Sequence, residues 1–221
     1  MTLRLYFHPL ASFCWKPLIA LYENHTPFEP IIVDLQDAKS RADFAAVYPP
    51  AKFPVLRDEA RGQTVAESTI IIEYLDAFYP GAAKMVPADP DQAWQARMWD
   101  RFFDNAMQTP MQKIVADTFR PQDLSDETGV AEAHDNIRAA YALLETHIAG
   151  KTWAMGESFT LADCAAAPAL TYCDCVTPIG PEHKNVSAYL DRLRKQPSFH
   201  RVLKEAEPYF PHFPIARKPT L

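Results

Sequence analysis

Hydrophobic and polar positions alternate in the first third of the chain and then change to a helical period. Leu3, Leu5 and Phe7 recur at every second position, which is typical of a short strand with one buried face. Apolar residues at spacings of three and four indicate helices between such strands. The first third therefore predicts strands over 3–7, 28–34, 53–57 and 63–66, and helices over 13–24, 38–47 and 68–78.

The order of these elements, βαβ-α-ββα, is that of a thioredoxin-like domain. Pro17 conflicts with the helix that contains it, because a proline lacks the amide donor and clashes with the preceding turn. We therefore expect this helix to begin near Ser12 or Phe13, so that Pro17 lies close to an irregular first turn.

Residues 80–91 are rich in proline and predict a linker. The period beyond it is helical throughout, and predicts helices over 92–118, 130–149, 161–176, 186–194 and 198–207. The sequence thus predicts an α/β thioredoxin-like N-terminal domain over residues 1–79 and an all-α helical C-terminal domain over residues 92–221.

The helix predicted over 161–176 opens on a capping box. The Thr160 hydroxyl can accept from the amide of Asp163, and the Asp163 carboxylate can reach back to the amide of Thr160. Phe159 adds an apolar residue just before the cap. We expect Asp163 to stabilise the fold and to have no catalytic role.

Composition and charge exclude several classes of function. The formal net charge of −6 argues against a nucleic-acid partner. No apolar run approaches the ~20 residues that span a bilayer, and we expect neither membrane association nor a secretory leader. Cys14 stands alone and three other cysteines lie within residues 164–175, so we expect reduced thiols and a cytoplasmic protein. We also expect no metal, because Cys173 and Cys175 would point ~200° apart on a helix.

The strongest chemical signal lies in two short segments, Lys52 to Leu56 and Glu67-Ser68. Pro54 cannot donate to a sheet ladder, and a cis bond before it would leave neighbouring backbone groups free for a ligand. Ser68 opens a predicted helix, whose first amides and dipole favour a carboxylate, and Glu67 could hold an ammonium. The alternative is that Glu67 and Ser68 only cap the helix.

Together these segments resemble the cytosolic glutathione S-transferase superfamily, over the full length of the chain. The resemblance is carried by Leu3 to Phe7, His8 to Cys14, Phe53-Pro54-Val55-Leu56, Glu67-Ser68, Ile72 to Leu75 and Phe159 to Asp163. It implies the two-domain fold of that superfamily, glutathione as co-substrate, a small hydrophobic electrophile as second substrate, and a homodimer. The loop after the first strand is similar to those of bacterial-type members of the serine, zeta and theta kinds.

The resemblance also implies a hydroxyl or thiol donor that stabilises the glutathione thiolate near the first helix. Ser12 is our leading candidate, with helix capping as its alternative role. The serine of serine-type members falls near Ala11, which leaves the donor open. Tyr6, on the first strand, is a second candidate, and Cys14 is a third, for mixed-disulfide chemistry.

The residues expected to bind glutathione follow from the same resemblance. Ser12 and Phe13 lie at the start of the first helix, and the backbone of Phe53, before Pro54, pairs with the cysteinyl part. Glu67 and Ser68 hold the γ-glutamyl end. Lys52, or alternatively Lys39, meets the glycyl carboxylate. An acidic residue of the second domain, Asp100 or Asp104, nears the γ-glutamyl ammonium.

A stripe of apolar residues on the helix over 92–118 is the candidate second site. Trp99, Phe103, Met107 and Met111 recur every four residues, and methionine and aromatic side chains suit adaptable pockets. Core packing is the alternative for each. The aromatic and proline-rich segment 209–214 either covers the mouth of the site or packs on the surface.

The predicted function is a glutathione transferase that joins the glutathione thiolate to a small hydrophobic electrophile. The alternatives are a glutathione-dependent isomerase, a disulfide reductase, and a non-catalytic glutathione-binding or interaction protein. Ala11 in the donor region favours the non-catalytic alternative, whereas Pro54, Glu67 and Ser68 oppose it.

Overall fold

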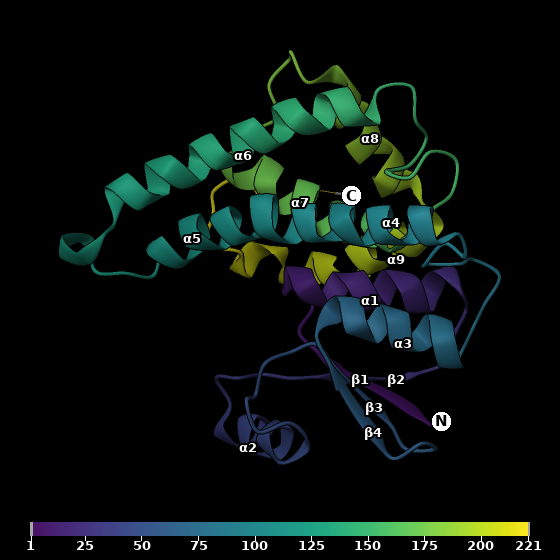
Figure 1. Cartoon of the computed structure of the whole chain (residues 1–221). Helices are drawn as coiled ribbons and strands as arrows, with labels where there is room; N and C mark the ends of the chain where they lie inside the picture. Colours follow the sequence, from purple (N-terminus) through teal and green to yellow (C-terminus); the bar gives the residue numbers. More distant parts are fainter. Residues whose placement is uncertain (1, 221) are drawn as a thin grey trace.

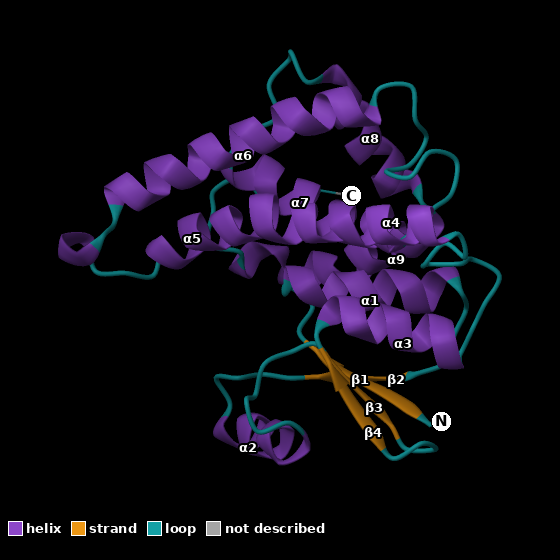
Figure 2. Cartoon of the chain, in the orientation of Figure 1, coloured by secondary structure: helices purple, strands orange, loops and turns teal. Residues whose placement is uncertain are grey.

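A computed structural model of the chain describes residues 2–220. A four-stranded sheet with three helices forms the N-terminal part, and the rest of the chain is helical (Figures 1 and 2). Helix α3 ends at Phe78 and helix α4 begins at Pro90, so the linker predicted over 80–91 overlaps the first two residues of α4. The fold is that expected from the sequence.

The sheet has the strand order β2-β1-β3-β4. Strand β1 pairs in parallel with β2 and antiparallel with β3, which in turn pairs antiparallel with β4. The predicted alternation in β1 is confirmed, since Leu3, Leu5 and Phe7 are buried. The strands are β1 (Leu3–Phe7), β2 (Glu29–Ile32), β3 (Val55–Asp58) and β4 (Gln63–Ala66).

Helices cover both faces of this sheet. Figure 1 shows α1 (Ser12–Glu23) and α3 (Ser68–Phe78) on one face and α2 (Ala38–Val47) on the other. On the α2 face, the ring of Tyr6 stacks on that of Phe44, with centroids 5.7 Å apart. Because side chains of a strand alternate between faces, Tyr6 points away from the face that Leu5 packs against.

The helical part is built around one buried helix, α7 (Leu161–Val176), which contacts α1, α4 and α5; Figure 1 labels each of them. Every residue of α7 from Leu161 to Cys175 is buried. The elements of the helical part are α4 (Pro90–Phe102), α5 (Thr109–Asp117), α6 (Glu127–Ile148), α7 (Leu161–Val176), α8 (Lys184–Lys195), α9 (Pro197–Ala206) and the 3₁₀ turns η2 (Gln122–Leu124) and η3 (Glu207–His212).

The prediction of one continuous α-helix over 92–118 is wrong for the middle of that range. A π-helical turn, η1 (Phe103–Gln108), separates α4 from α5. Pro110 has no amide donor and its ring crowds the preceding turn. The backbone amide of Thr109 bonds to the carbonyl of Asp104, five residues earlier, so the wide turn accommodates the proline.

The capping box of α7 is confirmed, and Asp163 makes further bonds. Its carboxylate accepts from the Thr160 amide at 2.9 Å, from the Ala154 amide at 2.8 Å and from the Tyr189 hydroxyl at 2.6 Å. Burial raises the pKa of Asp163 to about 6, and these donors oppose that rise. With the Thr160 hydroxyl at 3.2 Å as a fourth donor, this carboxylate without exposed surface holds the start of α7 to its neighbours.

Candidate functional site

Two cavities lie side by side and share the residues Phe13 and Phe53. The smaller, of about 160 Å³, lies between α1, the loop before β3 and the start of α3. It is lined by Phe13, Tyr48, Lys52, Phe53, Pro54, Ala66, Glu67 and Ser68. Six of these eight residues are ones that the sequence predicts for glutathione, so the structure brings the two signal segments together.

Backbone geometry presents these residues to the smaller cavity. The Phe53–Pro54 peptide is cis, and Glu67 has φ of 69°, a left-handed value that few non-glycine residues adopt. Glu67 makes no side-chain bond to the helix that follows, so its side chain does not cap α3. A non-glycine residue with such a positive φ is typical of a binding site. The exposed carboxylate and the first amides of α3 both remain open to a ligand.

The larger cavity, of about 610 Å³, is mostly apolar and shares Phe13 and Phe53 with the smaller one. Its walls come from the start of α1, from α5, from α7 and from the C-terminal segment. The lining residues are Leu10, Ala11, Ser12, Phe13, Phe53, Met111, Gln112, Val115, Ala116, Phe119, Tyr172, His212, Phe213 and Pro214. Of the 209–214 segment, residues 212–214 thus form part of this cavity wall.

Only part of the predicted apolar stripe reaches this cavity. Met111 lines it, but Phe103 and Met107 have no exposed surface and pack in the core. The Cys173 thiol of α7 bonds to the carbonyl of Met107, which shows that this stretch faces α7. Trp99 stacks on His147 of α6, with ring centroids 3.6 Å apart. Gln112, Val115 and Ala116 line this cavity, although the sequence did not predict them there. They lie after η1, and the sequence pattern did not reveal that turn.

Of the three candidate donors, Ser12 alone lies at the larger cavity. It is the first residue of α1, and within residues 2–220 its hydroxyl makes no hydrogen bond and does not cap the helix. Tyr6 packs on the opposite face of the sheet. Cys14 has no exposed surface, and burial raises its pKa to about 12. Ala11 also lines the cavity but carries no donor.

The candidate charged partners of glutathione separate clearly. Lys52 lines the smaller cavity, whereas Lys39 is exposed and pairs with Asp43 at 2.6 Å on α2. Asp100 and Asp104 are buried, and both contact the chain's own Lys16. Their expected place beside a ligand ammonium is therefore taken by a lysine.

Lys16 is the part of the site region that sequence reasoning missed. Its ammonium has no exposed surface and lies 2.8 Å from both Asp100 Oδ1 and Asp104 Oδ2. It also donates to the Thr69 hydroxyl at 3.0 Å, and that hydroxyl donates to Asp100 at 2.8 Å. The half-exposed Arg101 closes the cluster through both aspartates and Thr69. The sequence signal that could have revealed this cluster is a single lysine within the mostly apolar helix α1.

This ion cluster ties α4 to the two helices that present the cavities. Lys16 lies one turn after Ser12 on α1, and Thr69 directly follows Ser68 on α3. Two cations and two carboxylates balance each other formally. Burial raises the pKa of Asp104, although the Lys16 ammonium acts in the opposite direction.

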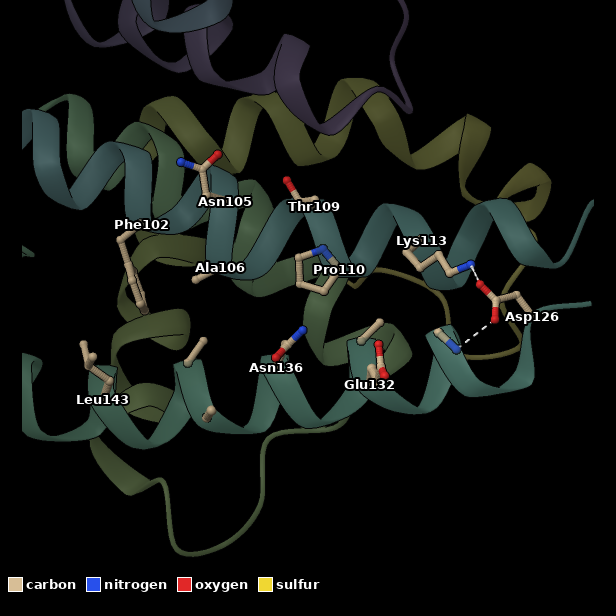
Figure 3. Close-up of a pocket in the computed structure, with 14 residues that line it drawn as sticks. Phe102, Asn105, Ala106, Thr109, Pro110, Lys113, Asp126, Glu132, Asn136 and Leu143 are labelled. Atoms are coloured by element: carbon tan, nitrogen blue, oxygen red, sulfur yellow. Dashed lines mark hydrogen bonds and ion pairs between the residues drawn. The ribbon is translucent and has the colours of Figure 1, made fainter.

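A third hollow lies between α4–α5 and α6, with a volume of about 650 Å³ (Figure 3). Lys113 and Asp126 form an ion pair at one end, and Phe102 and Leu143 lie at the other. None of the predicted glutathione residues lines it. In the part of the chain that the structure describes, no group of three His, Cys, Asp or Glu side chains could hold a metal, and no helix is suited to span a membrane.

Comparisons with known proteins identify the family of this chain. Residues 5–83 match the family model of the glutathione S-transferase N-terminal domain, and residues 127–192 match that of the C-terminal domain. The chain belongs to the cytosolic glutathione S-transferase superfamily. It is 25% identical to the glutathione S-transferase GstB of Escherichia coli over 190 residues, which are 85% of this chain and 91% of GstB.

Solved glutathione S-transferases share the fold. One from Methylobacillus flagellatus, with glutathione bound, has a TM-score of 0.83 at 22% identity and covers 90% of this chain and 98% of its own. One from Methylobacterium radiotolerans, in complex with glutathione sulfonate, has a TM-score of 0.79 at 26% identity and covers 90% of this chain and 93% of its own.

Replacing the buried cation of this transferase-family protein tests the ion cluster. We expect Lys16→Met to lower the free energy of unfolding by about 3–5 kcal/mol, because it leaves two buried carboxylates with too little positive charge. Lys39→Met, which removes an exposed ion pair, is the matched control and should change nothing measurable. Urea denaturation gives both values, and a Lys16→Met protein as stable as the control would contradict the assigned role.

The buried thiols predict slow chemistry at every cysteine. All four are free and buried, and burial raises the pKa of Cys14 and of Cys175 to about 12. At pH 8 the thiolate fraction of such a group is about one in ten thousand. An aromatic disulfide reagent should therefore label no thiol in the folded protein and all four after addition of urea. Fast labelling of Cys14 in the folded protein would restore it as a nucleophile.

Proposed function

We propose that this protein binds glutathione in the smaller cavity and transfers its thiolate to a small hydrophobic electrophile in the larger one. The observation that carries the proposal is that the two cavities share Phe13 and Phe53, with Ser12 next to Phe13. A polar subsite that adjoins a mostly apolar one suits a peptide thiol and an apolar second substrate.

The glutathione contacts follow from the charges that line the smaller cavity. The hydroxyl of Ser68 and the first amides of α3 bind the γ-glutamyl carboxylate, because a helix N-terminus favours an anion. Glu67 binds the ammonium, and the backbone of Phe53 pairs with the cysteinyl part beside Pro54. Lys52 binds the glycyl carboxylate. Two solved relatives with glutathione or its sulfonate bound support this choice of ligand.

Ser12 stabilises the thiolate in the proposed reaction. A free thiol has a pKa near 8.5, so a donor and the N-terminal dipole of α1 are needed to favour the anion at neutral pH. The hydroxyl of Ser12 donates to the sulfur, and the thiol proton passes to solvent. The sulfur then attacks the electrophilic carbon, and the leaving group departs with its electron pair.

A non-catalytic glutathione-binding protein is the second candidate. Ala11 lines the larger cavity near the position where serine-type members carry their donor, and this observation favours a binder without turnover. The two candidates share glutathione binding and differ only in the chemistry of Ser12. The four free, buried thiols are consistent with a reducing, cytoplasmic setting for either.

Calorimetry with glutathione tests the proposed site. We expect Glu67→Gln to weaken glutathione binding at least tenfold, because it removes the charge that faces the ligand ammonium. Glu182→Gln, an exposed glutamate outside the cavities, is the control and should bind as the parent does. If the parent protein fails to bind glutathione, both candidate functions are wrong.

Turnover then separates the two candidates. We expect Ser12→Ala to retain glutathione binding but to lose about 10²-fold in kcat, since one donor to the developing anion is gone. The ultraviolet absorbance of bound thiolate should fall with it. Binding without turnover on a panel of aryl and alkyl electrophiles in the parent protein would favour the non-catalytic candidate.

We also propose that the protein is a homodimer through α3 and α4. These helices are bridged by the Arg97–Glu73 ion pair at 2.8 Å, and each exposes two large apolar side chains to about half of their area. The four side chains are Ile70, Phe78, Trp94 and Met98. Exposed large apolar side chains on two helices that are joined in this way are typical of an interaction surface. The hollow of Figure 3 continues from α4 to α6, where Leu143 is also exposed.

Sedimentation tests the dimer. We expect the parent chain to sediment as a dimer and Met98→Asp to sediment as a monomer, because a charge in an apolar interface loses its hydration. Leu124→Asp is the matched control, since Leu124 is exposed on η2 and outside this face. A parent chain that sediments as a monomer would contradict the proposal.

A further inference from the structure

The walls of the larger cavity are chemically one-sided. Five of its lining residues are aromatic, and the rings of Tyr172 and Phe213 lie 5.0 Å apart. None of the fourteen described lining residues is a lysine, arginine, aspartate or glutamate. Such walls favour a flat aromatic ligand and disfavour a charged one. A charged group would lose its hydration on entering the cavity and would find no side chain of opposite charge there.

Few polar groups in this cavity have free hydrogen-bonding capacity. The Tyr172 hydroxyl is occupied, since it donates to the Leu10 carbonyl at 2.8 Å. Ser12 has a role at the thiolate in the proposed reaction. Gln112 of α5 and His212 of the C-terminal segment remain, and within residues 2–220 neither side chain makes a hydrogen bond. The next residue after Gln112, Lys113, has a partner, because its ammonium pairs with Asp126 in the hollow of Figure 3.

From this arrangement we infer that Gln112 and His212 are specificity-determining residues for an aryl electrophile that carries an uncharged hydrogen-bonding substituent, such as a carbonyl. This inference rests on the proposed function, because it concerns the second substrate of the same site. The carboxamide and the imidazole each offer a donor, and they come from two segments that meet only in the folded chain. Water bound to them is displaced without loss only by a group that remakes those bonds.

Two glutathione conjugates of nearly equal shape provide the test. S-(4-acetylbenzyl)glutathione carries a carbonyl oxygen where S-(4-isopropylbenzyl)glutathione carries a methyl group, so the ratio of their Kd values reports on the hydrogen bond. Calorimetry gives this ratio for the parent chain, for Gln112→Leu, for His212→Phe and for the double variant. Gln122→Leu, an exposed glutamine on η2, is the matched control.

The expected result is a shift of the ratio against the acetyl compound by about fivefold in the double variant, since one net hydrogen bond is of that size. Each single variant should show part of this shift, and Gln122→Leu none. Unmodified glutathione should bind equally to all five proteins. Because both residues are exposed, the variants should also unfold at the parent's temperature.

Failure of this inference differs from failure of the proposed function. If glutathione does not bind the parent chain, the proposed function fails and the inference falls with it. If glutathione binds but the benzyl groups add no affinity, the larger cavity is not the second site and the inference is overturned. An identical Kd ratio in the parent, the double variant and Gln122→Leu overturns it as well.

Discussion

A lysine ammonium with no exposed surface fixes the arrangement on which both cavities depend. The ammonium of Lys16 forms ion pairs with Asp100 of α4 and Asp104 of η1 and donates to the hydroxyl of Thr69 of α3. An unpaired charge at this depth would cost several kcal/mol, so α1, α3 and α4 have little freedom to slide past one another. Since Ser12 lies one turn before Lys16 and Ser68 directly precedes Thr69, this contact sets where the two hydroxyls stand.

The cluster also decides which acidic group is left for a ligand. Asp100 and Asp104 form ion pairs with cationic side chains of the same chain, so they are not free to bind a ligand. Glu67 is exposed beside the smaller cavity, in a backbone conformation that turns it out of the start of α3. The structure thus separates carboxylates that hold the domains together from the one that can meet a ligand's ammonium.

The division between polar and apolar cavities has a simple origin in the two halves of the fold. Loops and the start of α3 line the smaller cavity, and the first amides of a helix have no partner within it, so this cavity is more polar than the larger one. Side chains of α5, α7 and the C-terminal segment line the larger cavity, and helices satisfy their own backbone groups. What remains there is a set of mostly apolar side chains with a few isolated polar ones.

The sequence by itself determined the strands, most of the helices, the capping box and the two segments around the smaller cavity, because each depends on period or on residues close in the chain. It did not reveal η1, where Pro110 forces a wide turn, or that Phe103 and Met107 pack in the core while Gln112 lines a cavity. The rotation of a helix, the partners of Lys16 and the place of His212 depend on contacts between segments up to about two hundred residues apart. Only the tertiary structure decided them, because a buried ion cluster and a shared cavity arise when separate helices meet.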